Sequence, residues 1–364
     1  MIDEKPTVTD TGPTREEMST WDAERRLSRI QQIYIKHPRA KMIQTQMELH
    51  WRYGLRLRES TACFIVGNSR CGKSETLKRF VKQKTGVTVP KTSDGQALLV
   101  EGNGVRIVYL DAMNGATPLE ASKSMLKDLF QFQATFSENE ASGKVLHFFG
   151  IGKIDLLIID EGQKMIGKGS ATAATGKFAN WLLSMANARR VRIIVAGGPE
   201  LQDLIDGHHM IRDRKDSLQH ITPFAHATKA DRAAFAKFLA EFDAKTPFIK
   251  TPLTDLNLQD AFFFATRGRP GRLSFLLEKA TQVAFLESEE QPMPELTLSH
   301  VAQAFDLVML FETQMLGINP FGHDGDLPTI PQNLEQEGTD IFESKPAARS
   351  GSKGRGKGNR LYGK

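Results

Sequence analysis

Long apolar runs and cysteines are scarce in this sequence of 364 residues. No stretch approaches the length of a transmembrane helix, and the first residues, MIDEKPTVTDTGPTREE, are polar and acidic and lack the apolar region of a signal peptide. The two cysteines, Cys63 and Cys71, form neither a disulfide framework nor a zinc-binding pattern. These absences argue against a membrane protein and a disulfide-stabilised secreted protein, so we expect a cytoplasmic protein with no membrane partner.

Acidic residues are missing from the C-terminal end. The last twenty residues carry seven Lys or Arg and no Asp or Glu, which exceeds the net charge of +5 of the whole chain and leaves −2 for the rest. This end is also rich in Gly and Ser, a composition typical of disorder. We expect a disordered basic tail that binds a polyanion or an acidic protein partner. Nucleic-acid contacts of the folded part must then come from local clusters of charge.

Four dense apolar runs predict the strands of a parallel sheet, because they alternate with helical patterns in the manner of βαβ units. The runs lie at 61–66, 105–111, 154–160 and 191–196. Helices are expected at 24–36, 39–57, 114–136, 231–242, 256–266 and 272–286, and around Phe178, Trp181, Leu182, Met185 and Ala186. The expected organisation is a disordered N-terminus at 1–20, a helical segment at 21–58, an α/β core at 59–224, an all-α domain at 225–312 and a C-terminal extension at 313–364.

A phosphate-binding loop follows the first strand. Residues 67–74 read GNSRCGKS, a full match to G-x-x-x-x-G-K-[ST], and a helical pattern starts at Ser74. Gly67 and Gly72 let backbone N–H groups face an anion, Lys73 reaches the β- and γ-phosphates, and Ser74 offers its hydroxyl to Mg²⁺. The expected ATP-binding residues are Gly67, Asn68, Ser69, Arg70, Cys71, Gly72, Lys73, Ser74 and Glu75. A glycine turn with a nearby lysine is the alternative interpretation.

Two carboxylates end the third strand, where open α/β sheets place their ligands. We expect Asp160 to hold Mg²⁺ through water and Glu161 to orient the attacking water. An ordinary strand end is the alternative, but the phosphate loop upstream favours an ATP site. The fourth strand ends in Ala-Gly-Gly-Pro, and Gly198 stands where similar ATPases often carry a polar residue that senses the γ-phosphate.

Arginines at two places are candidates for stabilising charge on the phosphates. Arg272, with Arg269 as second choice, starts a helix of the all-α domain and would reach back to the γ-phosphate. Arg214 and Arg212 follow the fourth strand and would act on the ATP of a neighbouring subunit. A solvated basic turn and ordinary surface charge are the respective alternatives.

Five lysines near the third strand are the candidates for contacting DNA in the folded part, although a solvated face is the alternative for each. They are Lys144, Lys153, Lys164, Lys168 and Lys177. A ring or filament would repeat a weak contact many times, so modest local charge would suffice.

Several stretches together resemble the TniB/TnsC type of AAA+ ATPase, the ATP-dependent transposition regulators that serve DDE transposases. They are YIKHPRA at 34–40, DEGQ at 160–163, FANWL at 178–182, AN at 186–187, AGGPE at 196–200, TPF at 246–248, TPLTDL at 251–256 and TRG at 266–268. The resemblance covers about residues 25 to 300. Three positions depart from the family pattern: Gly198 replaces the usual threonine, His220-Ile221 an Arg-Phe pair, and Gln163 a histidine or similar residue.

The resemblance implies an AAA+ P-loop ATPase fold with a parallel-sheet core followed by a small all-α lid. It implies a bacterial ATPase, slow and DNA-stimulated, that uses ATP and Mg²⁺ and forms a homo-oligomeric ring or helical filament on double-stranded target DNA. Such a regulator recruits or activates a transposase, works with a target-selection adaptor protein, and is disassembled by hydrolysis. Two alternatives share the core: a helicase-loader or replication-initiation ATPase, and a nucleotide-dependent signalling switch without nucleic acid.

Overall fold

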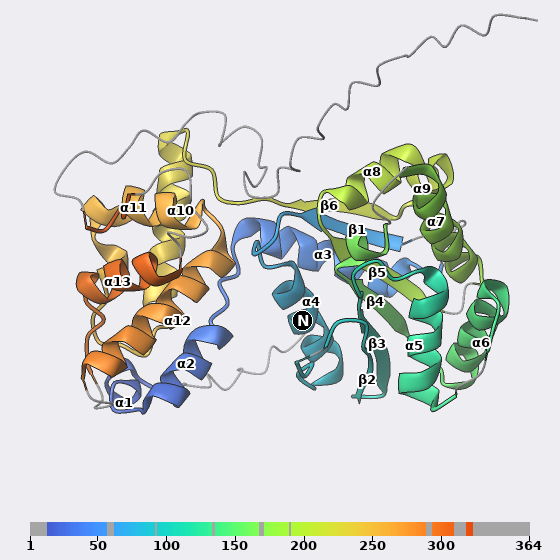
Figure 1. The fold of residues 1–364 in the computed structure, drawn as a ribbon, viewed down its shortest axis with the longest axis horizontal. Coiled ribbons are helices and arrows are strands. Elements are labelled where there is room, and N and C mark those ends of the chain that lie inside the picture. The colour runs from blue at the N-terminus through green and yellow to red at the C-terminus, as the bar shows by residue number, and fades with distance from the viewer. Residues whose placement is uncertain are drawn as a thin grey trace, which may run out of the picture.

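The computed structural model shows two bodies, a core built on a sheet and a bundle of helices beside it (Figure 1). It describes residues 13–56, 62–91, 93–132, 135–166, 171–188, 191–288, 293–308 and 318–322. We call the helical bundle the lid. The basic tail and Lys168 lie outside the described residues.

Six strands form one sheet in the order β2-β3-β4-β5-β1-β6. Their bounds are β1 Ala62–Gly67, β2 Ala97–Gly102, β3 Val105–Asp111, β4 Leu156–Asp160, β5 Arg192–Gly197 and β6 Ser217–Ile221. All neighbours pair in parallel except β2, which pairs antiparallel with β3. The predicted parallel sheet is therefore confirmed, and β1, β3, β4 and β5 are its predicted strands.

The two edge strands, β2 and β6, escaped the sequence analysis. In β6, which reads SLQHI, only Ile221 is buried, and in β2 only Ala97 and Val100 are buried. An edge strand lacks the dense apolar run of a central strand because one side of it faces solvent.

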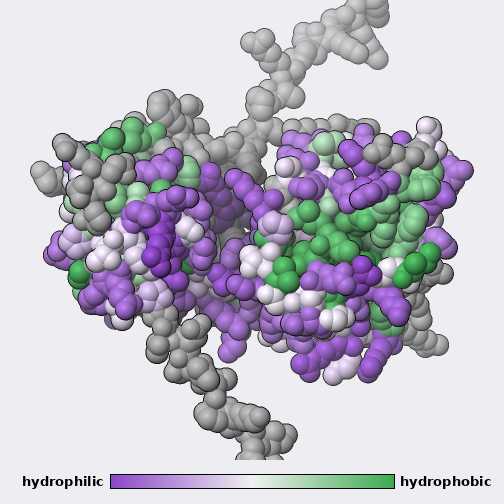
Figure 2. Space-filling model, turned by 90° about the horizontal axis from the view of Figure 1, so that it is seen from below, coloured by the Kyte–Doolittle hydropathy of each residue, from purple (hydrophilic) through white to green (hydrophobic). Residues whose placement is uncertain are grey.

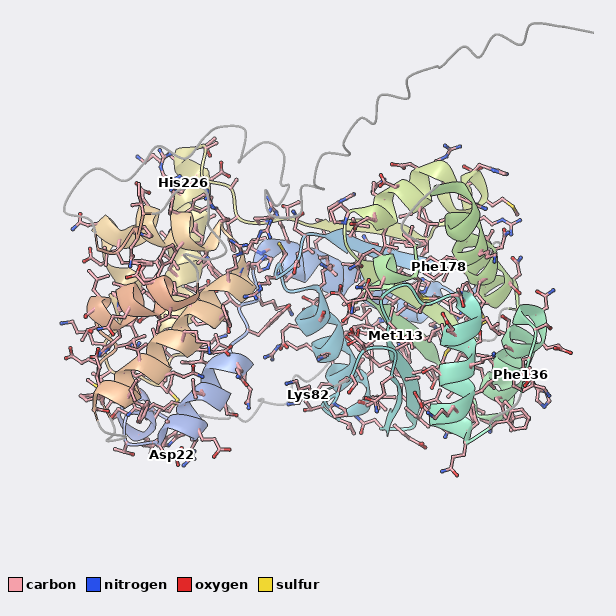
Figure 3. All side chains as sticks on the ribbon, in the orientation of Figure 1. Asp22, Lys82, Met113, Phe136, Phe178 and His226 are labelled. Atoms are coloured by element: carbon pink, nitrogen blue, oxygen red, sulfur yellow. The ribbon has the colours of Figure 1, made fainter. Side chains whose placement is uncertain are left out.

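Helices cover both faces of the sheet. One face is covered by α3 (Pro38–Tyr53) and α4 (Lys73–Thr85), the other by α5 (Pro118–Phe130), α6 (Glu138–Ile151) and α7 (Ala171–Asn187). Ile43 and Met47 of α3 are fully buried among residues of β1, β3, β4 and β5, so the apolar stripe of this helix packs on the core. On the other face, Phe178 of α7 lies in the interior, whereas Phe136 lies at the outer edge (Figure 3).

The helix expected at 114–136 is present as α5 but is shorter than predicted, and the sequence analysis missed the separate helix α6. The chain leaves α5 at Gln131, which has a φ of 52°, and starts α6 after Ser137, whose side chain accepts the N–H of Glu140. A left-handed residue cannot continue an α-helix, and a serine cap starts a new one. The core is completed by α8 (Glu200–Gly207), α9 (His209–Arg214) and a short 3₁₀ turn after β4, η1 (Gly162–Met165).

The lid is an aromatic-rich bundle. It contains α10 (Lys229–Asp243), η2 (Pro252–Thr254), η3 (Leu256–Leu258), α11 (Gln259–Thr266), α12 (Pro270–Glu287) and α13 (Leu298–Val308). Phe235, Phe248, Phe262 and Phe305 are all buried in its core. Seen from below, the lid surface is mostly hydrophilic, while the core shows a broad apolar area (Figure 2).

The N-terminal helices belong to different bodies. The short helix α1 (Arg15–Met18) lies within the range expected to be disordered, and α2 (Ala23–Gln32) packs on the lid, where Ile30 is fully buried. Residues 33–37, which we call the crossing segment, then lead to the core, where α3 begins. The segment treated as one unit in the sequence, 21–58, is thus divided between the two bodies.

Within the described ranges, every helix falls short of the length and apolar character needed to span a bilayer.

Candidate nucleotide-binding site

The phosphate loop lies between β1 and α4, as expected from the sequence. Gly67 ends β1, where a Cβ atom would lie 2.2 Å from the carbonyl oxygen of Ile221, and Gly72 has a φ of 95° before the first turn of α4. Both positions therefore require glycine. Lys73 is 5% exposed and its Nζ donates hydrogen bonds to the carbonyl oxygens of Gly67 (2.7 Å) and Asn68 (2.9 Å). The backbone of the loop thus surrounds the ammonium group of Lys73, which lies where nucleotide phosphates would be held.

Asp160 ends β4 as a buried carboxylate. Its Oδ2 accepts a hydrogen bond of 2.5 Å from the Tyr109 hydroxyl, and its Oδ1 accepts the backbone N–H of Glu161 at 2.9 Å. Burial raises the pKa of the Tyr109 phenol, and the charge of Asp160 raises it further, so Tyr109 remains a donor. Both of these donors are neutral. The buried negative charge of Asp160 is therefore available to a cation.

The residues present fit Mg²⁺. A serine hydroxyl and a buried carboxylate, Ser74 and Asp160, are oxygen donors of the kind that Mg²⁺ prefers. Among the described residues there is no cluster of three or more His, Cys, Asp or Glu that would hold a metal alone. This donor set suits an ion that completes its shell with water and nucleotide phosphates.

Glu161 follows in a left-handed conformation with a φ of 53°. Its Oε2 accepts a hydrogen bond of 2.7 Å from the Nε2 of Gln163, and the Oε1 of Gln163 accepts the N–H of Gly198 at 2.7 Å. Gln163 was noticed in the sequence only as a departure from a family pattern. The sequence gives only its place two residues after the acidic pair, and its closeness to Gly197 at the end of β5 and to Gly198 after it is visible only in the structure.

A cavity of about 150 Å³ opens beside the phosphate loop. The crossing segment supplies one wall through Ile33, Tyr34, Ile35 and His37. The loop and α4 supply Cys71, Gly72, Glu75 and Thr76, and the lid supplies Phe238, Phe242, Pro270, Gly271 and Ser274. Aromatic and apolar walls interspersed with polar side chains suit a nucleoside whose phosphates extend into the neighbouring loop.

The lid touches the phosphate loop directly. The N–H of Gly271, in the first turn of α12, donates to the carbonyl oxygen of Arg70 at 2.8 Å. A Cβ atom on Gly271 would lie 2.8 Å from the same oxygen, so only glycine permits this approach. The Arg70 guanidinium lies 4.5 Å from the centroid of the Phe275 ring, also on α12. The variable part of the loop is therefore packed against the lid.

The arginine candidates fall into two places. Arg269 and Arg272 are each 4% exposed at the start of α12, next to the glycine that contacts the loop. Arg212 and Arg214 lie on α9, at the opposite side of the core from the lid (Figure 1). Arg214 donates to Asn187 at 3.1 Å, and Arg212 lies 3.6 Å from Asp213. The structure brings the first pair to the site and leaves the second pair away from it.

The described lysines proposed to contact DNA do not form one cluster. Lys153 precedes β4 and Lys164 follows it, so they lie at opposite ends of that strand. The Nζ of Lys164 lies 2.9 Å from Asp94 and 3.8 Å from Asp111, which pairs with Asp160 in the sheet. Lys144 lies over the rings of Phe132 and Phe136 at 5.2 and 5.6 Å, and Lys177 lies on α7.

Comparisons with known proteins agree with this architecture. Residues 56–205 match the family model of the AAA domain. Cdc6p of Pyrobaculum aerophilum has 12% identity and a TM-score of 0.51, over 77% of this chain and 70% of that chain. Orc1 of Aeropyrum pernix, in a structure with DNA, has 13% identity and a TM-score of 0.53, over 79% and 70%. No curated protein matches the chain. At such low identities the likeness shows a common fold, and the chain thus has the α/β fold of the AAA+ ATPases, with helices after the sheet.

Proposed function

We propose that this chain is an ATP-dependent AAA+ regulator of DNA transposition. With ATP it assembles as a homo-oligomer on duplex target DNA and recruits or activates a transposase, and hydrolysis drives disassembly. The observation that carries the proposal is the cavity lined jointly by the crossing segment, the phosphate loop and the lid. The crossing segment includes part of the stretch, 34–40, that resembles transposition regulators.

The residues of the site are suited to hydrolysis. Water forms a bond to the γ-phosphorus while the bond from that phosphorus to the β–γ bridging oxygen breaks, giving ADP and inorganic phosphate, which takes up the water's proton. Glu161 would orient the water, and Lys73 would offset negative charge on the β- and γ-phosphates. Mg²⁺, when bound through Ser74 and Asp160, would supply further positive charge at the phosphates.

The position of the lid would depend on which nucleotide is bound. Because α12 contacts the loop at Arg70 and presents Arg272 beside it, a γ-phosphate would interact with both bodies, whereas ADP lacks this group. A ligand shifts a conformational equilibrium only through different contacts in the two states. We therefore propose that ATP and ADP favour different positions of the lid, and that the ATP position permits assembly.

The test compares the purified protein on duplex DNA with ATP, a non-hydrolysable analogue and ADP, by electron microscopy and DNA-binding assays. Assemblies should form with ATP and the analogue but not with ADP. Lys73→Ala should abolish them, and Glu161→Gln should form assemblies that persist because ATP is not consumed. The matched control is Lys82→Ala, an exposed lysine on the same helix (Figure 3). Nucleotide-independent assembly, or full ATP-dependent assembly by Lys73→Ala, would overturn the proposal.

A replication-initiation or helicase-loading function is the second candidate, and the fold shared with Cdc6p and Orc1 favours it. The two functions differ in the partner. Stimulation of strand transfer by a transposase supports the first, and loading of a helicase onto DNA supports the second. A signalling switch without nucleic acid would show ATP hydrolysis that duplex DNA does not change.

A further inference from the structure

Gln163 is the side chain that joins Glu161 to the end of β5. It lies in η1, where its amide group is used twice: the NH₂ donates to Glu161, and the oxygen accepts the N–H of Gly198, both at 2.7 Å. An amide can do both at once because it carries donors and an acceptor. A carboxylate at this position would lack the donor for Glu161.

Glycines on the neighbouring strand make room for this amide. A Cβ atom on Gly197 would lie 2.4 Å from the Oε1 of Gln163, and one on Gly198 would lie 3.3 Å from its Cγ. At neither glycine is a positive φ found, so the need is for space rather than for an unusual backbone. The sequence indicates only that Gly198 stands where similar ATPases often carry a polar residue. The structure shows that the Gly-Gly pair lets Gln163 lie across the end of β5.

Glu161 is constrained from both sides as a result. Its backbone N–H is fixed by Asp160 at 2.9 Å, and its carboxylate is fixed by Gln163. Without the amide, the carboxylate would be free to rotate about its side-chain bonds. A water-orienting group must be held in the productive geometry, and loss of an orienting hydrogen bond slows catalysis without removing substrate contacts.

We propose that Gln163 is a positioning residue for hydrolysis, which holds the Glu161 carboxylate and ties it to the strand end at Gly198. In this chain the amide takes the place of a polar side chain from β5 itself. This inference rests on the proposed ATP hydrolysis. It predicts that Gln163 affects the rate of the chemical step and not the affinity for ATP.

The experiment measures steady-state ATP hydrolysis with duplex DNA, together with binding of a fluorescent ATP analogue, for the wild type and variants at Gln163. Gln163→Ala should lower kcat by about tenfold or more and change KM less than about twofold. Gln163→Glu, which places a second carboxylate beside Glu161, should lower kcat at least as much. The control is Gln202→Ala, whose amide donates to Asp206 on the same helix and should leave kcat unchanged.

A double-mutant cycle separates positioning from a general structural role. Because Gln163 acts through the carboxylate of Glu161, adding Gln163→Ala to Glu161→Gln should cause no further loss of kcat. Additive losses, or a wild-type kcat in Gln163→Ala, would overturn the inference. If the wild type hydrolyses no more ATP than Lys73→Ala, the proposed function fails instead. Should Gln163→Ala not fold, Gln163→Glu takes its place in the double-mutant cycle with Glu161→Gln, and the same outcomes decide.

Discussion

His37 connects the crossing segment, α3 and the nucleotide cavity. Its Nδ1 accepts the N–H of Ala40 at 3.4 Å as the N-cap of α3, and its ring centroid lies 5.4 Å from that of Phe224. Burial, helped by the charge of Arg39, lowers the pKa of His37 to about 4. The ring is therefore neutral at pH 7, which keeps Nδ1 able to accept a hydrogen bond.

The depressed pKa predicts acid sensitivity at this residue. The unfolded chain binds a proton on His37 near pH 6.5, whereas the folded chain does so near pH 4, so its contribution to the free energy of unfolding falls as pH drops through this window. His37→Asn keeps a capping oxygen without a titrating ring. Denaturant unfolding at pH 7 and pH 5 should show a smaller loss in His37→Asn than in the wild type. An equal change for exposed His147→Asn would contradict the assignment.

At the scale of elements, the buried side chain of Arg26 connects α2 to the lid. Arg26 is fully buried, with its guanidinium carbon 5.0 Å from the Phe248 ring centroid and 5.3 Å from that of Phe285. Its guanidinium donates to the carbonyl oxygens of Trp21 at 3.0 Å, Ser19 and Met293. Burial lowers its pKa to about 10, so it stays charged at neutral pH.

We expect Arg26→Ala to destabilise the protein by about 2–4 kcal/mol, because three partly buried carbonyl groups lose their donor and two aromatic rings lose the cation. The neighbouring Arg25 is exposed and lies over Trp21 at 3.9 Å, so Arg25→Ala should cost at most about 1 kcal/mol. Chemical denaturation of both variants measures the difference. An equal loss of unfolding free energy in the two variants would show that the buried Arg26 does not hold α2 on the lid.

The sequence predicts those elements that are marked by a contiguous motif or a contiguous apolar run. The loop GNSRCGKS and the run before Asp160 are recognisable because each motif is contiguous, and the central strands because both of their faces are apolar. Gln163 could not be predicted, since its role depends on the approach of Gly197 from a distant strand. Likewise, the apolar periodicity around Ile30 predicts a helix, but not that it packs on the lid.

At the scale of the whole molecule, lid and core meet around the nucleotide cavity. The contact from Gly271 to Arg70 joins a residue of the lid to the phosphate loop of the core. A side chain at 271 would force the two apart by its clash with the Arg70 carbonyl. Lid position and nucleotide affinity should therefore be coupled.

Gly271→Ala tests this coupling. Loss of one hydrogen bond at the contact, about 1 kcal/mol, should weaken ATP binding by roughly fivefold. Titration with a fluorescent ATP analogue gives the affinity. Gly143→Ala, on α6 and with nothing within 4 Å of the added Cβ, is the control and should bind as the wild type does. Unchanged affinity in Gly271→Ala would mean that the lid does not act on the loop.

The split of the N-terminal helices between the two bodies has a consequence for biosynthesis. Helix α2 leaves the ribosome before its partners on α12 and around Phe248, which are made more than 200 residues later. At about 5–20 residues per second, the interval is on the order of tens of seconds. During translation the core can close around its sheet while Ile30 still lacks its packing partners. The lid is therefore completed after the core, and the cavity beside the phosphate loop forms only when the crossing segment has met α10 and α12.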